Sequence, residues 1–211
     1  MIESLDDQPT YPNQEPQART EPENPPWAKE LLEKLKTHSQ WTYEHSLRTS
    51  LIAQHLGQVL GFDSDTVETL RIAGLLHDIG KIETPNEILD NNKPVLTPEQ
   101  LTEIRKHPQI GFNLILPFDE KVAKVIVAHH EIMQKERYPR SETRGESNGE
   151  LEKLQLLVAL ADKTDAGMSK RPYKDALPPE EIQNALSKVC DLSLVLTAVS
   201  FRANLPEVKP T

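Results

Sequence analysis

This sequence has a single cysteine, no excess of positive charge and no long apolar run. Among its 211 residues there is one cysteine, Cys190. A single thiol cannot form an intramolecular disulfide, so a disulfide-stapled fold is excluded and a reducing compartment is indicated. The surrounding segment LSKVCDLSL is typical of a helix end. We therefore expect a packed thiol there rather than a nucleophile.

The formal net charge is −9 at pH 7. Because binding to a nucleic-acid backbone needs a positive face, this balance argues against bulk nucleic acid as a partner, although a local basic pocket stays open. No apolar run approaches the ~20 residues of a membrane span. The first ten residues, MIESLDDQPT, are acidic and lack the apolar centre of a secretory signal. The sequence thus predicts a cytoplasmic protein without a membrane segment.

The first 26 residues differ in composition from the rest of the chain. They are rich in Pro, Glu, Asp, Gln and Asn and hold few large apolar residues. Such a segment cannot bury enough apolar surface to offset the entropy lost on ordering. We interpret residues 1–26 as a disordered acidic, Pro-rich tail, either a solubilising leader or a docking segment. Residues 27–205 are predicted to form one domain, followed by a short C-terminal tail at 206–211.

In the rest of the chain, the spacing of apolar residues predicts helices, and no segment shows the alternating pattern of a strand. The predicted fold class is therefore all-α. Helices are predicted over 25–38, 39–61, 63–80, 96–108, 110–131 with a break at Pro117, and 150–170, with two more after Pro178–Pro179. Thr97 is the expected cap of its helix and Gly61 the expected end of the long helix. Segments 81–95 and 132–150 are predicted loops. One apolar face is predicted for the long helix, made of Leu47, Leu51, Ile52, Leu56, Val59 and Leu60.

Seven histidines occur in the sequence, and two of them, His38 and His55, are interpreted as structural. The other five, together with Asp78 and Asp162, fall at expected helix ends or on apolar helix faces. A buried carboxylate without a partner is costly, and shared divalent cations would satisfy all of these groups at once. Imidazole and carboxylate ligands suit Mn, Fe, Zn or Ni, and the lack of thiolates argues against a structural zinc site.

The adjacent pair His129–His130 favours two ions over one. Neighbouring residues on a helix diverge by about 100°, so these two rings serve neighbouring ions more readily than a single ion. One carboxylate, Asp78 for preference, would bridge the pair. Two metals about 3.5–4 Å apart can clamp the attacking and leaving oxygens of an in-line displacement and hold a hydroxide between them. The predicted chemistry is phosphoryl transfer to water.

The ordered set formed by His45, HDIGK, HP, HHE and ADKTDA…RPYK resembles the HD superfamily of metal-dependent phosphohydrolases. More narrowly, it resembles the HD-GYP branch, which includes cyclic di-GMP phosphodiesterases of bacterial signalling. The resemblance covers roughly residues 41–175. It implies a helical bundle with a metal site between helices, holding two divalent ions, Mn or Fe in preference to Zn, Ni or Mg. The implied metal ligands are His45, His77, Asp78, His107, His129, His130 and Asp162, with Asp78 bridging.

The resemblance also implies residues that act on the substrate. Lys81 would approach the scissile phosphate and, with Asp78, make up the catalytic pair. Arg171 and Lys174 in RPYK would contact substrate phosphate, and Tyr138 matches the tyrosine of the loop that names the branch.

The sequence departs from the pattern of the branch in two places, the signature loop and Trp41. Its signature, H-H-E-x-x-D-G-x-G-Y-P, reads HHEIMQKERYP here, with Gln134 in place of Asp and Lys135 and Arg137 in place of both glycines. Glycines in such a loop supply φ > 0 or close backbone approach, so another loop path and weaker hydrolysis of cyclic di-GMP than of generic phosphodiesters are predicted. Trp41 stands where some members carry a glutamate that helps to hold a third metal, so two metals are expected.

Three functions remain open from the sequence. The first is a metal-dependent phosphodiesterase that hydrolyses cyclic di-GMP or a related nucleotide through a dinuclear metal-activated hydroxide. The second is a nucleotide phosphohydrolase with another substrate, and the third is a degenerate module that binds a nucleotide or a partner without turnover. The sequence predicts no receiver, PAS or membrane sensor domain, so regulation is expected from a partner or the acidic tail. A signalling protein or a second copy of the chain, forming a homodimer, is the partner expected.

Overall fold

The computed structural model describes residues 23–89, 95–133, 138, 149–170 and 175–206, and this part of the chain is helical without a strand. The prediction of an all-α fold is confirmed. The elements are α1 (Pro26–His38), α2 (Gln40–Val59), α3 (Ser64–Leu76), the 3-10 helix η1 (Ile79–Glu83), α4 (Asn86–Leu89), α5 (Pro98–Ile104), α6 (His107–Ile115), α7 (Glu120–Ile126), α8 (Gly149–Met168), α9 (Pro179–Leu186) and α10 (Leu192–Ala203).

Polar caps begin several of these helices where the sequence places them. The Asp63 carboxylate accepts a hydrogen bond from the Thr66 amide at the start of α3. Thr97 and Gln100 form a reciprocal capping box at α5, which satisfies two amides that have no intrahelical partner. After α2 the chain turns at Gly61, whose φ of +71° is costly for any residue with a Cβ.

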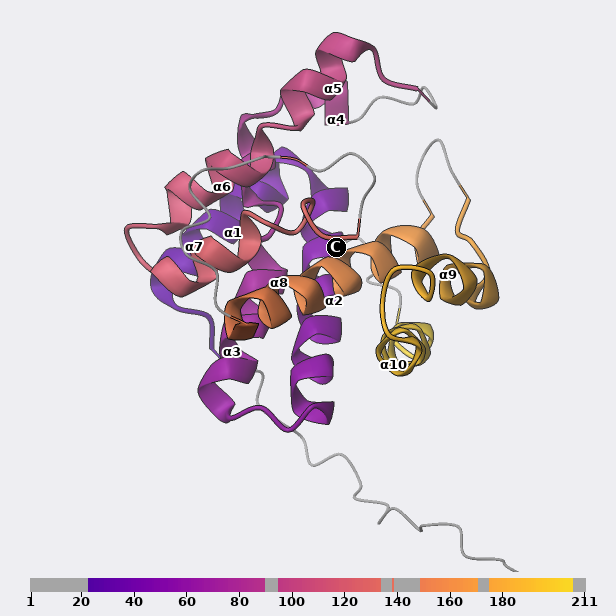
Figure 1. Cartoon of the computed structure of the whole chain (residues 1–211). Coiled ribbons are helices and arrows are strands. Elements are labelled where there is room, and N and C mark those ends of the chain that lie inside the picture. The colour runs from indigo at the N-terminus through magenta and orange to yellow at the C-terminus, as the bar shows by residue number, and fades with distance from the viewer. Residues whose placement is uncertain (1–22, 90–94, 134–137, 139–148, 171–174, 207–211) are drawn as a thin grey trace, which may run out of the picture.

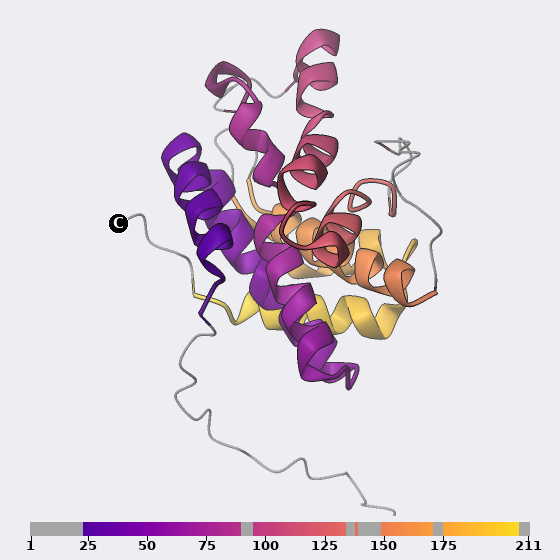
Figure 2. The ribbon, with the colours of Figure 1, turned by 90° about the vertical axis from the view of Figure 1, so that its left-hand side faces the viewer.

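Helix α2 lies at the centre of the fold and contacts α1, α3, α8 and α10 (Figure 1). Leucines and isoleucines from these helices form a shared core, with Leu56, Leu76 and Leu157 all fully buried. Figures 1 and 2 show α4 and α5 projecting away from the other helices. The core therefore holds α2, α3 and α8 against one another, and these are helices that carry or adjoin candidate ligands.

The contact between α2 and α3 is close because Gly74 has no side chain. A Cβ at Gly74 would lie 2.8 Å from the Cα atom of Ser50, which is closer than real Cβ atoms approach. The Ser50 hydroxyl donates to the Arg71 carbonyl across the same contact. This approach brings the start of α2, with His45, near the end of α3, where His77 follows.

Three details of the predicted helices are wrong. Leu51 and Val59 are 41% and 56% exposed, because α2 is covered on several sides and buries small residues such as Ser46 and Thr49 in their place. The predicted loop over 81–95 contains most of η1 and all of α4. His107 begins α6 instead of ending the helix before it, because Pro108 is accommodated in a first turn, where its missing N–H is not needed.

Several predictions fall outside the described residues: the tail up to residue 22, the substituted loop at 134–137, and Arg171 and Lys174. Just before α1, the side-chain oxygen of Asn24 accepts a 2.7 Å hydrogen bond from Arg71. The division into a tail and one domain at 27–205 stays a prediction. In the part of the chain that the structure describes, no helix is long and apolar enough to cross a membrane.

Candidate metal centre

All seven candidate ligands lie together, although they come from five segments of the chain. His45 is near the start of α2, His77 and Asp78 join α3 to η1, and His107 is the first residue of α6. His129 and His130 follow α7, and Asp162 lies in α8. Their donor atoms form two groups, each with its atoms within 4.8 Å of one another: His45, His77 and Asp162 in the first, and Asp78, His107, His129 and His130 in the second.

The first group converges on one carboxylate oxygen of Asp162. Its Oδ1 atom lies 3.2 Å from Nε2 of His45 and 3.9 Å from Nε2 of His77. All three residues are buried. An imidazole pair and a carboxylate at this spacing offer a divalent cation three ligands.

The second group places two ring nitrogens against each other. Nε2 of His107 lies 3.2 Å from Nε2 of His129, and the same His107 nitrogen lies 3.2 Å from Oδ1 of Asp78. The ring of His130 is 4.0 Å from that of His129, centroid to centroid. Three imidazoles and one carboxylate thus surround a second small volume.

Asp78 faces both groups, one with each oxygen. Its Oδ2 atom lies 3.3 Å from Nε2 of His77 and 3.8 Å from Nε2 of His45. Its Oδ1 atom lies 3.2 Å from His107 and 3.9 Å from His129. This is the arrangement that a carboxylate needs in order to bridge two cations.

Backbone carbonyls set which ring nitrogen faces the cluster. Nδ1 of His77, His107 and His129 each donates to the carbonyl three residues earlier, in Gly74, Ile104 and Ile126. Burial lowers the pKa of His107 and lowers that of His129 strongly, so these rings are neutral at pH 7. Their Nε2 atoms then carry lone pairs that face each other and Asp78, which is unfavourable unless a cation lies between them.

The two carboxylates are ionised in spite of their burial. Burial alone would raise the pKa of Asp78, but nearby positive charge, chiefly that of the Lys81 ammonium, outweighs it and holds that pKa well below its usual range. Burial opposes ionisation of Asp162 in the same way, and Lys163 and His45 outweigh it. Ionised carboxylates and neutral imidazoles are the forms that bind metals.

Hydrogen bonding within the described residues leaves part of the cluster unsatisfied. His77 Nε2, Asp78 Oδ1 and Asp162 Oδ2 are buried without a hydrogen-bond partner. Buried polar atoms of this kind are rare in folded proteins and call for an ion or a ligand. With nitrogen and oxygen donors and no thiolate, the cluster fits a divalent metal ion.

A buried ion-pair network behind His45 was missed by the sequence reasoning. Nδ1 of His45 lies 2.7 Å from Oδ2 of Asp165, and Arg48 and Arg202 both donate to the other oxygen of that carboxylate. Burial alone would lower the pKa of His45, but Asp162 and Asp165 outweigh it and raise it. The sequence spacing could have indicated two of these residues. Asp165 is three residues from Asp162 and Arg48 is three residues from His45, so each lies on the same helix face as a predicted ligand. Nothing in the sequence marks Arg202.

The predicted substrate residues that the structure describes also lie at the cluster. The ammonium of Lys81 is 2.6 Å from Oδ2 of Asp78. The ring of Tyr138 stacks on His130 at 4.7 Å, and Arg105 lies 5.2 Å from the same ring. Burial and the two carboxylates raise the pKa of Tyr138, so its phenol stays protonated. Trp41 stacks on His45 at 5.3 Å and offers no ligand atom.

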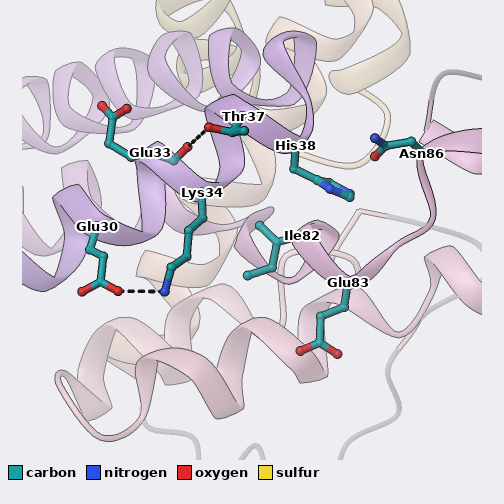
Figure 3. Close-up of a pocket in the computed structure, with 8 residues that line it drawn as sticks. All are labelled: Glu30, Glu33, Lys34, Thr37, His38, Ile82, Glu83 and Asn86. Atoms are coloured by element: carbon teal, nitrogen blue, oxygen red, sulfur yellow. Dashed lines mark hydrogen bonds and ion pairs between the residues drawn. The ribbon is translucent and has the colours of Figure 1, made fainter.

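The residues interpreted as structural are engaged elsewhere. Nε2 of His38 lies 2.8 Å from the carbonyl oxygen of Thr84, and His55 stacks on Phe201 at 4.0 Å. Cys190 is half-buried against the core, and burial raises the pKa of its thiol. His38 also borders an open groove between α1 and the η1–α4 segment, which Figure 3 shows with Glu30, Glu33 and Glu83 at its edges. None of the seven candidate ligands lines this groove.

Known proteins resemble this chain over most of its length. A cyclic di-GMP phosphodiesterase of Thermotoga maritima is 35% identical over 161 residues, which cover 72% of this chain and 42% of the relative. The 3'3'-cGAMP-specific phosphodiesterase 1 of Vibrio cholerae is 30% identical over 149 residues, 70% of this chain and 34% of the relative. The chain therefore spans between about a third and two fifths of the length of these relatives. The resemblance to cyclic di-GMP phosphodiesterases expected from the motifs is confirmed.

A solved structure shares the fold. The HD domain of the Listeria monocytogenes phosphodiesterase PgpH matches with a TM-score of 0.60 at 16% identity, over 81% of this chain and 96% of that domain. The family model described as HD domain matches residues 42–167, a range that contains all seven candidate ligands. The chain belongs to the HD domain family.

Proposed function

We propose that this chain is a metal-dependent phosphodiesterase domain that hydrolyses a cyclic dinucleotide. The observation that carries the proposal is the position of Asp78, whose two oxygens face two separate groups of nitrogen and oxygen donors. A single carboxylate shared in this way is typical of sites that hold two cations close together.

The proposed ligands are His45, His77 and Asp162 for one cation and His107, His129 and His130 for the other, with Asp78 shared between them. Mn²⁺ and Fe²⁺ suit this mixture of imidazole and carboxylate donors. Two such cations would supply Lewis acidity toward a phosphoryl oxygen and lower the pKa of water at the site.

The chain's own side chains complete the proposed site for an anionic substrate. The Lys81 ammonium holds Asp78 and offers positive charge where negative charge develops during phosphoryl transfer. The protonated phenol of Tyr138, beside His130, is a hydrogen-bond donor for the substrate. Burial of the ligands at the junction of several helices keeps bulk water away, which strengthens each of these interactions.

Cyclic dinucleotides are proposed as the substrate class because the curated relatives are named for cyclic di-GMP and 3'3'-cGAMP. The related fold of PgpH has been solved with cyclic-di-AMP. Residues 134–137 replace the Asp and Gly positions of the branch signature. We therefore expect cyclic di-GMP to be hydrolysed more slowly than a generic diester.

The test is a substrate panel on protein stripped with a chelator and reloaded with Mn²⁺ or Fe²⁺. The panel holds cyclic di-GMP, 3'3'-cGAMP, cyclic di-AMP and bis(p-nitrophenyl) phosphate, and products are followed by chromatography. We expect metal-dependent hydrolysis of at least one cyclic dinucleotide and none by Asp78→Ala. A metal-loaded protein that binds a cyclic dinucleotide in calorimetry but leaves it intact would contradict the proposal and support a binding module.

A further inference from the structure

The carboxylate of Asp165 is the meeting point of three helices. It lies on α8 and is fully buried. Its Oδ2 atom is 2.7 Å from Nδ1 of His45 and 3.2 Å from Nη2 of Arg48, both on α2. Its Oδ1 atom accepts a 2.7 Å hydrogen bond from Nε of Arg48 and another from Nε of Arg202 on α10.

Two buried guanidinium groups surround this one carboxylate. Arg48 and Arg202 are 4% and 3% exposed, and both donate to the hydroxyl of Ser169, at 3.3 and 3.2 Å. One guanidinium already suffices to neutralise Asp165. Charge balance alone therefore does not require Arg202, whereas a fixed orientation of the carboxylate does gain from a second donor on a different helix.

The orientation of Asp165 decides which nitrogen of His45 faces the metal groups. Because the Asp165 carboxylate accepts from Nδ1 of His45, Nε2 is directed at Oδ1 of Asp162, 3.2 Å away. Carboxylates that accept from the outer nitrogen of a metal-binding histidine fix its ring and raise its basicity. Any shift of Asp165 would turn the His45 ring away from its group.

We propose that Arg202 is a positioning residue of the metal centre: it locks Asp165 and, through it, His45. Arg202 lies on α10, beyond the residues 42–167 that match the HD domain. The inference rests on the proposed function only in so far as the first group binds a metal. It follows that α10 supports a metal site although none of the proposed ligands lies on this helix. Removing the guanidinium of Arg202 should weaken metal binding while every ligand stays in place.

The test compares three variants by calorimetric titration of chelator-stripped protein with Mn²⁺, alongside melting curves in EDTA. Arg202→Met is expected to weaken binding at one of the two sites by about 10-fold, the lower end of the range for losing a direct partner of a ligand, because Arg202 acts through Asp165. Arg202→Lys keeps the charge but loses the planar fork, so a smaller loss is expected. Arg71→Met is the matched control, because Arg71 is also buried but pairs with Glu68 and Asn24, away from the cluster.

A general effect of losing a buried arginine would appear equally in the control. We expect Arg71→Met to lower the melting temperature while its Mn²⁺ affinity stays at the parent value. Parent affinity in Arg202→Met, or an equal loss in Arg71→Met, overturns the proposal. If Arg202→Met does not fold, Arg202→Lys and Ser169→Ala replace it in the test. Mn²⁺ affinity equal to that of the parent in both variants would then overturn the proposal.

The same titrations separate this inference from the proposed activity. A parent protein that binds Mn²⁺ but cleaves no cyclic dinucleotide refutes the activity alone, and the Arg202 comparison then still decides the role of α10. A parent protein that binds no Mn²⁺ overturns both.

Discussion

The ammonium group of Lys81 lies 2.6 Å from Oδ2 of Asp78, the oxygen that also faces His45 and His77. The two residues are three positions apart at the start of η1, and the amide of Lys81 donates to the carbonyl of Asp78 as well. Lys81 thus brings a positive charge to the bridging carboxylate without being a metal ligand itself. Its role can be separated from metal binding by mutation.

Replacing Lys81 with Met is expected to leave Mn²⁺ binding intact and to lower kcat by about 10²–10³-fold, the range seen when one preorganised donor is removed. The measurements are metal content by mass spectrometry and turnover of the best substrate in the panel. Lys106→Met serves as the control, because Lys106 forms an exposed ion pair with Glu103 and should have no effect. Parent-like turnover by Lys81→Met on every substrate would show that Lys81 plays no part in the reaction.

Asp78→Ala removes the one carboxylate that faces both groups. We expect it to abolish tight Mn²⁺ binding at both sites and with it all hydrolysis, because each group loses an oxygen ligand. Asp119→Ala is a suitable comparison, since Asp119 caps α7 and its loss should cost about 1 kcal/mol of stability with metal binding unchanged. Two bound Mn²⁺ ions per chain in Asp78→Ala would rule out the bridging role.

Gly80 lies where η1 meets the backbone of α6. A Cβ there would be 2.0 Å from the carbonyl oxygen of His107 and 2.7 Å from the amide nitrogen of Gly111. Gly80→Ala must therefore push η1 away from α6, at a cost of about 1–3 kcal/mol, and separate Asp78 from His107. We expect a lower melting temperature together with weaker Mn²⁺ binding at the second group.

Gly149→Ala provides the contrast for this prediction. A Cβ at Gly149 meets nothing within 4 Å, so this change is expected to leave both stability and metal binding close to the parent values. Equal behaviour of the two alanine variants would mean that the close contact at Gly80 is not what sets the distance between Asp78 and His107.

The residues that the sequence identified share one property: each belongs to a short motif or to a helix end. His77, Asp78 and Lys81 could be found because charged groups follow an apolar helix, and the order of the remaining ligands along the chain added to this. Asp165 and Arg202 are different, since their pairing with His45 joins α2, α8 and α10, segments far apart in sequence. Periodicity does not encode such contacts, because they depend on how helices pack in three dimensions.

Packing also explains the errors in the predicted helices. An apolar residue such as Leu51 looks buried when one face of a single helix is considered. The fold surrounds α2 with four other helices, and the closest of these contacts need small residues such as Ser50 opposite Gly74. Which residues of α2 are buried therefore depends more on the helices that pack against each position than on the hydropathy of the residue.

The position of Asn24 bears on where the acidic tail can be removed. Asn24 accepts a 2.7 Å hydrogen bond from the buried guanidinium of Arg71, and Glu23 pairs with Lys29. We expect a chain that starts at Glu23 to melt at the temperature of the full chain, whereas one that starts at Pro26 should lose about 1–3 kcal/mol because a donor of Arg71 is left without its partner. Urea unfolding of both chains measures the difference, and a large loss in the longer one would show that residues 1–22 stabilise the fold.

Lys163 lies between the two groups and competes with the cations that we propose for them. Its ammonium is 3.4 Å from Oδ2 of Asp162, in the first group, and 3.4 Å from Nδ1 of His130, in the second. When Nδ1 of a neutral imidazole accepts a hydrogen bond, the ring proton is on Nε2. Metal binding by either nitrogen of His130 must therefore displace Lys163 or move that proton.

Lys163→Met is accordingly expected to bind Mn²⁺ about two- to fivefold more tightly than the parent, the equivalent of the 0.2–1 kcal/mol typical of a partly exposed ion pair. Without metal the same variant should melt at a lower temperature, because Asp162 loses a compensating charge while buried. Lys121→Met, which breaks the exposed pair with Glu150, should change neither quantity. Titration with Mn²⁺ and melting in EDTA measure both effects, and weaker Mn²⁺ binding by Lys163→Met would show that Lys163 supports the metal centre instead of competing with it.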